Sequence, residues 1–348
     1  MTSSEPNDRI DHLTRLAEDF FGERVTHVST PGGTDRASIR VTLESRSVIA
    51  TLRPNFRRTH LEAYILKILE SECDCAPKFM GLRENVLFQS DLGGNRLNTA
   101  IWKAGQADRA SIAFSAVEAI LRIQKAANRV GLRDALPILG ANDDWVENLV
   151  HAIDTMESIS HGRSITLNRA ELCQKIVTRP RSFVKWDCRS GNAAVSNSNS
   201  VKWFDFEYAG VRHGAEDLAW LIADEAWPIN PEVMEKIILD CLPSEDRSAA
   251  DTYLDYLWLY TSFHCIQRIK LIMKEVVKRG WLSKSRIRKF DDAGVHPEFA
   301  YNLCKVGEYA AYRNRETALL ARDFADGQRF FLSIMRDGLA ARGAIAAE

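Results

Sequence analysis

Three oxygen-bearing side chains in the middle of the chain have the types and spacing that phosphoryl transfer requires. Asp187 and Asn192 form the pattern D-x-x-x-x-N, and Asp205 follows the apolar run VKWF in the triplet D-F-E. A carboxylate and an amide suit Mg²⁺, which prefers hard oxygen ligands and keeps several waters beside nucleotide phosphates. The separate carboxylate of Asp187 is suited to accept the proton of an attacking hydroxyl, or to orient that hydroxyl.

The sequence between these motifs predicts how they meet. Residues 193–195 and 201–204 have the composition of two short strands, and a Ser/Asn-rich tract joins them. A hairpin of this kind places the residue before its first strand beside the residue after its second strand. We therefore expect Asn192 and Asp205 to lie together at the open end of the hairpin.

Each of these residues also has an ordinary structural explanation. Asp187 can cap a turn, Asn192 tolerates a left-handed backbone, and Asp205 alone can be a surface carboxylate. An isolated D-x-x-x-x-N pattern arises often by chance. The hairpin and the D-F-E triplet at the right distance favour the chemical interpretation.

Other site classes lack their minimum parts. The chain contains no G-x-x-x-x-G-K-[ST], G-x-G-x-x-G or H-E-x-x-H pattern, which excludes the usual P-loop, dinucleotide and zinc-protease sites. Its eight histidines have no ligand spacing, and Cys73-Asp74-Cys75 has no second cysteine pair to complete a zinc site. We expect all seven cysteines to be reduced thiols that mostly pack in the core.

The elements that must position these residues fall into two regions. The length of 348 residues agrees with about two folding units, at roughly 150 residues each. Residues 1–92 predict a small β-rich unit of two helices and five short strands. These elements are expected at about 8–22 (helix), between Val25 and Pro54 (three antiparallel strands), from Arg57 to Ser71 (helix), and near 78–82 and 85–89 (strands).

Residues 93–348, which begin at a double glycine, predict a mostly helical second unit. Its extended sequence lies in one island between Phe183 and Phe206, so the catalytic and metal loops occupy 183–207. Helices are predicted over 108–129, 142–158, 165–177, 213–226, 231–241, 248–279, 296–325 and 328–342.

The D-x-x-x-x-N and D-F-E motifs resemble those of the aminoglycoside phosphotransferase family, relatives of the protein kinases, whose motif runs approximately H-G-D-x-x-x-x-N and then D-F-E or D-F-G. The resemblance covers roughly residues 20 to 225. It implies an α+β, protein-kinase-like bilobal fold, with a small antiparallel β-rich N-terminal lobe that has one main helix, and a large, mostly α-helical C-terminal lobe.

The same resemblance implies an activity. The chain would be a Mg²⁺-dependent kinase that transfers the γ-phosphate of ATP, or of GTP, to a hydroxyl of a small-molecule acceptor. Asp187 would be the catalytic base, Asn192 and Asp205 would bind Mg²⁺, and the helices after residue 225 would shape the acceptor pocket. Asp217 matches the structural aspartate that follows the family's metal loop.

The resemblance also implies a set of nucleotide-binding residues in the first lobe. The third strand, SVIATLRP, contains no lysine, so Arg53 is the cation available to pair with Glu62 and to fix the α and β phosphates. Two alternative interpretations stay open. The double glycine Gly32-Gly33 can be a plain hairpin turn, and Glu62 can be a solvated residue, as most acidic residues on helices are. The implied set consists of Gly32, Gly33 and Thr34 in the loop over the phosphates, Arg53, Glu62, and Gln89 and Asp91 at the hinge.

Departures from the family pattern motivate a second hypothesis. Lys185-Trp186 replaces His-Gly before Asp187, and Arg189-Ser190 stands where the family often has His-Pro. Together with the absent strand lysine, these changes suggest a catalytically impaired pseudokinase that acts as a nucleotide- or partner-binding module. A protein kinase is less favoured, because helix follows the D-F-E triplet almost at once and leaves little room for an activation segment.

The charge of the chain restricts its partners. Forty-six Lys and Arg against forty-seven Asp and Glu leave a formal charge of −1, which argues against nucleic acid and anionic membranes. No long apolar run or signal peptide is evident, so we expect a cytoplasmic protein. Residues 265–290 carry nine Lys or Arg and one Glu. This segment is either a solvated helix face or, if it borders the cleft, a feature that favours an acidic or phosphorylated acceptor. No sequence feature specifies the oligomeric state.

Overall fold

The computed structural model describes residues 6–31, 33, 36–160, 167–177, 181–242, 247–290 and 293–337. Its N-terminal lobe is an antiparallel five-stranded sheet of order β1-β2-β3-β5-β4, accompanied by two helices. The elements are α1 (Pro6–Phe21), β1 (Val25–Ser29), β2 (Ser38–Leu43), β3 (Ser47–Thr51), α2 (Phe56–Leu69), β4 (Phe79–Arg83) and β5 (Val86–Ser90). The predicted helices and strands of this region are confirmed, each within about two residues of its expected position.

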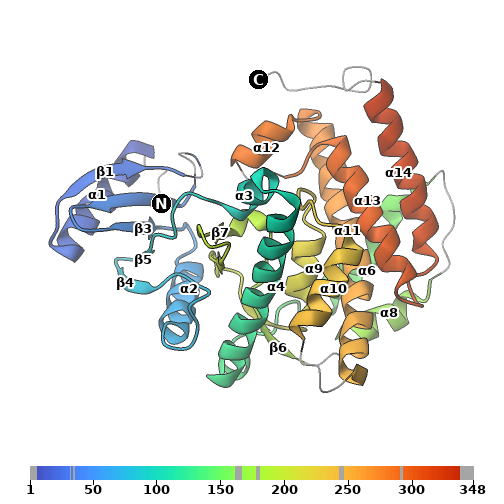
Figure 1. The fold of residues 1–348 in the computed structure, drawn as a ribbon, viewed down its shortest axis with the longest axis horizontal. Helices are drawn as coiled ribbons and strands as arrows, with labels where there is room; N and C mark the ends of the chain where they lie inside the picture. The colour runs from blue at the N-terminus through green and yellow to red at the C-terminus, as the bar shows by residue number, and fades with distance from the viewer. Residues whose placement is uncertain are drawn as a thin grey trace.

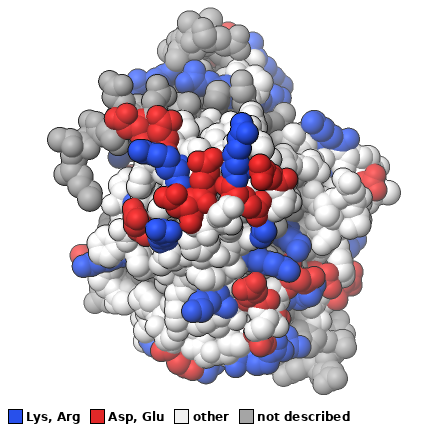
Figure 2. Space-filling model, turned by 90° about the vertical axis from the view of Figure 1, so that its left-hand side faces the viewer, with Lys and Arg blue, Asp and Glu red and all other residues white. Residues whose placement is uncertain are grey.

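The two helices cover opposite faces of this sheet. Strand residues point alternately to the two sides, so Val86 and Phe88 pack with α1, whereas Leu87 joins the core that contains α2. The strand β2 shows the same alternation, with Ile39 and Val41 fully buried under α1. On the surface that this lobe presents at the left of Figure 1, acidic and basic side chains are interspersed, and the acidic ones gather in a band (Figure 2).

The rest of the described chain is a helical lobe (Figure 1). Its core is built around α4 (Gln106–Arg129), α9 (Ala215–Ile222), α10 (Pro231–Cys241) and α11 (Arg247–Arg279), which share one large apolar cluster. The helices are α3 (Leu97–Lys103), α4 (Gln106–Arg129), α5 (Leu132–Ala135), α6 (Asp143–His151), α7 (Asp154–Glu157), α8 (Arg169–Val177), α9 (Ala215–Ile222), α10 (Pro231–Cys241), α11 (Arg247–Arg279), α12 (Lys284–Phe290), α13 (Pro297–Tyr312) and α14 (Leu320–Asp337). Short strands interrupt them: β6 (Ser182–Val184), β7 (Ala193–Val195), β8 (Val201–Trp203) and β9 (Gly210–Arg212), with the 3₁₀ turn η1 (Ser190–Asn192) before β7.

The predicted hairpin is confirmed. Strands β7 and β8 pair in antiparallel register, with Ala193 opposite Trp203 and Val195 opposite Val201. Beyond the strands, the backbone N–H of Phe204 donates to the carbonyl oxygen of Asn192 over 2.9 Å. The residue before Asp205 is therefore bonded directly to Asn192.

Two of the predicted helices are interrupted. The segment 142–158 is divided into α6, which ends at His151, and α7, which begins at Asp154. The segment 296–325 is not continuous, because α13 ends at Tyr312 and α14 begins at Leu320, eight residues before the expected start of the last helix. Asn314 causes the break: its side-chain oxygen accepts the N–H groups of Glu316 and Thr317, and its amide nitrogen donates to Asp255 on α11. An asparagine that satisfies the following N–H groups competes with the helical hydrogen bonds. Residues 338–342 of the predicted last helix lie outside the described residues.

Across the described ranges, no helix combines the length and the apolar character that are needed to cross a bilayer.

The packing of the sheet against α1 gives a stability prediction. Phe88 is fully buried and stacks on Phe20 at a centroid distance of 5.0 Å. Replacing Phe88 with Ala is expected to lower the free energy of unfolding of this lobe by about 3–5 kcal/mol, because a large cavity remains. Urea denaturation of purified protein measures the loss. Phe56→Ala is the control, because Phe56 is 54% exposed, and equal effects of the two substitutions would contradict the packing described.

Candidate active site

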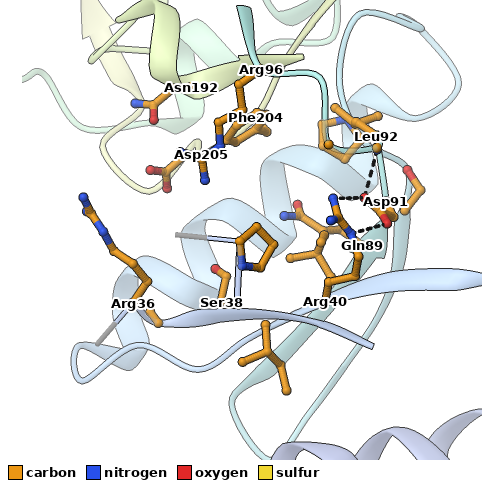
Figure 3. Close-up of a pocket in the computed structure, with 18 of the residues that line it drawn as sticks. Arg36, Ser38, Arg40, Gln89, Asp91, Leu92, Arg96, Asn192, Phe204 and Asp205 are labelled. Carbon is orange, nitrogen blue, oxygen red and sulfur yellow. Dashed lines mark hydrogen bonds and ion pairs between the residues drawn. The ribbon is translucent and has the colours of Figure 1, made fainter. Parts of the chain in front are cut away.

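A cavity of about 440 Å³ lies between the sheet and the hairpin loops (Figure 3). Six of the residues implied by the family resemblance line it: Arg53, Glu62, Gln89, Asp91, Asn192 and Asp205. Asp187 is not among the lining residues but contacts Asn192. Gly33 lies in a turn with φ of 100°, beside the cavity residue Pro31. Gly32 and Thr34 lie outside the described residues.

Asp187 and Asn192 are bonded to each other. The side-chain amide nitrogen of Asn192 donates to Oδ2 of Asp187 and to its carbonyl oxygen, both over 3.0 Å. Because the amide nitrogen is engaged there, the amide oxygen of Asn192 is the atom directed to the cavity (Figure 3). Asp187 and Asn192 thus lie at the two ends of one short segment, 187–192, which ends in the 3₁₀ turn η1.

Arg189 is the cationic partner of Asp187. Its Nε donates to Oδ1 of Asp187 over 2.7 Å, and its Nη2 lies 3.3 Å from Oδ2. Burial would raise the pKa of Asp187, but the positive charge and hydrogen bonds of Arg189, with smaller contributions from Lys185 and Arg268, hold it below its usual value. The carboxylate is therefore ionised at neutral pH.

Asp205 belongs to a cluster of three carboxylates around one guanidinium group. Arg53 contacts Glu62 at 2.6 Å, Asp205 at 2.7 Å and Glu207 at 3.1 Å. Glu62 is fully buried on α2, and its other oxygen accepts the N–H of Phe206 over 3.0 Å. The Arg53–Glu62 pair expected from the sequence is present, but the same guanidinium also holds both acidic residues of the D-F-E triplet.

Burial raises the pKa of Glu207, and the nearby charge of Asp205 raises it further, while Arg53 and Arg58 oppose the shift. For Arg53, burial would lower the pKa, but its three carboxylate partners raise it. The pKa of each group in this cluster therefore depends on the charge of its neighbours. Removal of Arg53 would leave three carboxylates close together with little compensation.

Lys185 connects the turn that carries Asp187 to the loop of the D-F-E triplet. Only 1% of the residue is exposed, and its ammonium donates to the carbonyl oxygen of Asp205 over 3.0 Å. The carbonyl oxygens of Trp186 and Asp187 lie at 3.4 and 3.5 Å from the same nitrogen. These three residues all have left-handed backbones, with φ of 60°, 49° and 66° for Trp186, Asp187 and Asp205. A buried ammonium thus gathers the carbonyl groups of three strained positions.

Asp217 on α9 holds the same turn by hydrogen bonds to its backbone. Its carboxylate accepts the backbone N–H groups of Lys185 and Trp186, over 2.9 and 2.8 Å, and the amide of Gln124. Burial raises the pKa of Asp217, although these hydrogen bonds oppose the shift. The structural position that the resemblance implied for Asp217 agrees with these contacts.

Sequence reasoning missed a second support, formed by Asp224 and Glu225. Asp224 accepts both the N–H and the hydroxyl of Ser190, over 2.7 and 2.5 Å. Glu225 forms a two-bond ion pair with Arg268 of α11, over 2.6 and 3.0 Å. Burial would raise the pKa of Glu225, but Arg268 lowers it to about 2. Arg268 lies in the basic segment 265–290 and is buried, so the view of that segment as a wholly solvated face is wrong for this residue.

Asp91, directly after β5, lines the cavity at the junction of the two lobes and is held by ionic and hydrogen bonds. Its carboxylate receives two bonds from Arg40 of β2, over 2.6 and 3.0 Å, and one from the hydroxyl of Ser47. Burial would raise the pKa of Asp91, whereas these donors lower it. Gln89 is buried beside them on β5, and among the described residues its side-chain oxygen has no hydrogen-bond partner. Gln89 can therefore offer that oxygen to a ligand.

The donor set at the hairpin end of the cavity fits Mg²⁺. Asn192 directs an amide oxygen to the cavity, and Asp205 lines it with a carboxylate of which Oδ1 is bonded to Arg53. One amide and one carboxylate oxygen are hard ligands of the kind that Mg²⁺ binds together with water and phosphate.

The Asp187–Arg189 pair predicts a pH-dependent stability difference. Asp187 has a folded-state pKa below the unfolded value of about 3.9, so its ionised form stabilises the fold above that pH. This contribution is lost as the pH falls through the lowered value. Arg189→Gln is therefore expected to be less stable than the wild type at pH 7, and the difference should shrink at pH values below about 4.

Urea unfolding midpoints between pH 7 and pH 3 measure this difference. Arg133→Gln is the control, because its pair with Asp134 is exposed and should contribute little at any pH. A difference between Arg189→Gln and the wild type that stays constant over this range would contradict the assignment.

Solved structures with a similar fold are small-molecule phosphotransferases. Spectinomycin phosphotransferase in complex with ADP and spectinomycin has a TM-score of 0.56 and 14% identity, over 91% of this chain and 98% of that chain. A choline/ethanolamine kinase family protein from Mesorhizobium loti has a TM-score of 0.54 and 12% identity, over 93% and 99%. No protein-family model matches the chain, and no curated protein matches its sequence. The chain thus has the α+β, protein-kinase-like fold of the aminoglycoside phosphotransferases and choline kinases, at low sequence identity.

Proposed function

We propose that this protein is a kinase that transfers the γ-phosphate of ATP, or of GTP, to a hydroxyl of a small-molecule acceptor. The observation that carries the proposal is the contact of Asp187 with Asn192, beside a cavity that Asn192 shares with Asp205. These are the residues that the sequence singled out as base and metal ligands. Their proximity creates a place where an acceptor hydroxyl, a phosphate and a divalent ion can meet.

The residues of the site have separate roles in this proposal. Asp187, kept ionised by Arg189, accepts a hydrogen bond from the acceptor hydroxyl and takes its proton as the bond to phosphorus forms. Asn192 and Asp205 hold Mg²⁺, which when bound neutralises charge on the transferred phosphate. Lys185 and Asp217 keep the catalytic turn and the D-F-E loop in fixed relation.

Nucleotide binding is supported by structures with the same fold. Spectinomycin phosphotransferase is described in complexes with AMP and with ADP, and a 2′-phosphotransferase in a complex with GDP. The 440 Å³ cavity is flanked by the hinge residues Gln89 and Asp91, where a base would lie, and by Asn192 and Asp205, where phosphates would lie. The cavity therefore extends from Gln89 and Asp91 at one end to Asn192 and Asp205 at the other (Figure 3).

Several similar structures are complexes with small molecules. Their descriptions name gentamicin, kanamycin and spectinomycin. For this chain we propose a small acceptor that binds on the helical lobe beside Asp187. Trp186 stands next to that carboxylate, and its ring lies between those of Trp145 and Trp220, at centroid distances of 5.7 and 5.9 Å. An aromatic wall of this kind suits the apolar face of a ring-containing acceptor.

A second candidate function is the binding of a nucleotide or a partner without catalysis. The observation that favours it is the ion pair of Asp187 with Arg189, which engages both oxygens of the proposed base. Incubation with Mg–ATP and a panel of sugars, amino alcohols and aminoglycosides separates the two functions. ADP release that depends on an acceptor supports the kinase, and nucleotide binding without such release supports the second candidate.

The role of Asp187 gives the first functional prediction. Asp187→Asn is expected to lower the turnover number by about 10²–10⁴-fold, because the proton acceptor is lost. The dissociation constant of Mg–ATP should stay within about twofold of the wild-type value, because Asp187 does not line the cavity. Acceptor-dependent ADP release and calorimetric titration measure the two quantities. Asp11→Asn on the exposed face of α1 is the control. Unchanged turnover in Asp187→Asn would exclude Asp187 as the proton acceptor.

The role of Asn192 gives a second functional prediction. In the wild type, Mg²⁺ is expected to strengthen ATP binding relative to ATP with a chelator. In Asn192→Ala this strengthening should fall by about tenfold, because one ligand oxygen is removed. Titration of ATP with and without Mg²⁺ measures the ratio directly and requires no acceptor. Asn197→Ala, in the exposed loop of the same hairpin, should keep the wild-type ratio, and an equal ratio in Asn192→Ala would exclude Asn192 as a ligand.

A further inference from the structure

The cation expected to bind the nucleotide phosphates is already engaged with carboxylates. Arg53 contacts Glu62, Asp205 and Glu207, and only 9% of its side chain is exposed. Arg58 adds a weaker contact to Glu207 at 3.7 Å. Three carboxylates against two guanidinium groups leave this cluster with a net negative charge. A Mg²⁺–triphosphate is also a net anion, so the cluster by itself does not favour it.

Three further arginines line the same cavity: Arg36, Arg40 and Arg96. Arg40 forms the two-bond pair with Asp91 at the hinge, so its charge is balanced within the cavity wall. Arg36 and Arg96 lie on the two sides of the cavity near Asp205, and their side chains extend toward the end that contains Asn192 and Asp205 (Figure 3). Arg36 and Arg96 thus add formal positive charge at the end where Glu62, Asp205 and Glu207 outnumber Arg53 and Arg58, and where the phosphates would lie.

Backbone contacts place both residues at the walls of the cavity. The N–H of Arg36 donates to the carbonyl oxygen of Gly33 over 3.2 Å, at a position between β1 and β2. Arg96 is the N-cap residue of α3 and pairs with Ala194 of β7, two residues after Asn192. Its guanidinium lies 6.0 Å from the ring centroid of Phe204, directly before Asp205. One arginine therefore belongs to the N-terminal lobe, and the other contacts the β7–β8 hairpin.

We propose that Arg36 and Arg96 bind the nucleotide phosphates from the two sides of the cleft, while Arg53 organises the carboxylates of Glu62, Asp205 and Glu207. This inference rests on the proposed function. A guanidinium group can donate two parallel hydrogen bonds to phosphate oxygens, and its charge does not titrate near neutral pH. Two such groups supply the positive charge that a third strand without lysine does not provide.

The test compares ligands that differ only in their number of phosphates. Calorimetric titrations of Mg–ATP, Mg–ADP, AMP and adenosine are carried out on the full chain and on the variants Arg36→Gln, Arg96→Gln and the double variant. Each single substitution is expected to weaken ATP binding by about tenfold, and the double substitution by about a hundredfold. The loss should decrease from ATP to AMP, and adenosine affinity should stay within about twofold of the wild type. If the wild type prefers GTP, the guanine series replaces the adenine series.

Controls separate phosphate binding from a loss of structure. Arg15→Gln on the exposed side of α1 should bind every ligand like the wild type. Arg96→Lys keeps a positive charge and should recover part of the ATP affinity that Arg96→Gln loses, whereas Arg96→Met, which keeps a side chain of similar length without the charge, should not recover it. Circular dichroism and the urea midpoint establish that each variant is folded.

The results that overturn this inference differ from those that overturn the proposed function. ATP affinity in the double variant within about twofold of the wild type would refute the phosphate role of both arginines and leave the kinase proposal intact. An equal loss for adenosine and ATP would also refute it, because the effect would then not depend on phosphate. If the wild type binds neither triphosphate with Mg²⁺, the proposed function fails, and this inference fails with it.

Discussion

The ion cluster around Arg53 is the interaction on which the rest of the site depends. One guanidinium joins the buried Glu62 of the N-terminal lobe to Asp205 and Glu207 of the D-F-E loop. Carboxylates at such short separations repel each other strongly in a partly buried environment, so they need a shared cation. The planar fork of arginine can serve several partners at once, which the single ammonium of a lysine does less well. This geometry gives a physical reason for an arginine after the third strand.

Around this cluster, backbone groups are held by side chains from sequence-distant elements. Lys185 binds the carbonyl groups of three left-handed residues, and Asp217 binds the N–H groups of Lys185 and Trp186. Left-handed backbones at residues other than glycine cost free energy and persist where surrounding contacts determine them. A turn with Lys185-Trp186, where the family that the sequence resembles has His-Gly, is therefore ordered here, because the ammonium donates to several carbonyl groups.

The sequence was sufficient where local pattern decides structure. The alternating pattern of β2, the helical spacing of α1 and α2 and the β7–β8 hairpin follow from periodicity and turn chemistry, and the hairpin alone brings Asn192 and Asp205 together. It was insufficient where a single side chain overrides pattern, as Asn314 does between α13 and α14. It also could not identify Lys185, Arg189 or Arg268 as parts of the site, because charged residues are usually exposed and their burial here depends on partners far along the chain.

The bond between Arg53 and Oδ1 of Asp205 has a consequence for how a divalent ion would enter. A carboxylate that already neutralises a guanidinium is not a vacant ligand, so a metal arriving there competes with the arginine in an exchange of one cation for another. The free energy of occupancy is then the difference between two attractions, which weakens the apparent affinity. Glu62 and Glu207 would retain the arginine after such an exchange. Because Arg53 comes from one lobe and Asp205 from the other, the spacing of the two lobes becomes coupled to which cation the aspartate holds.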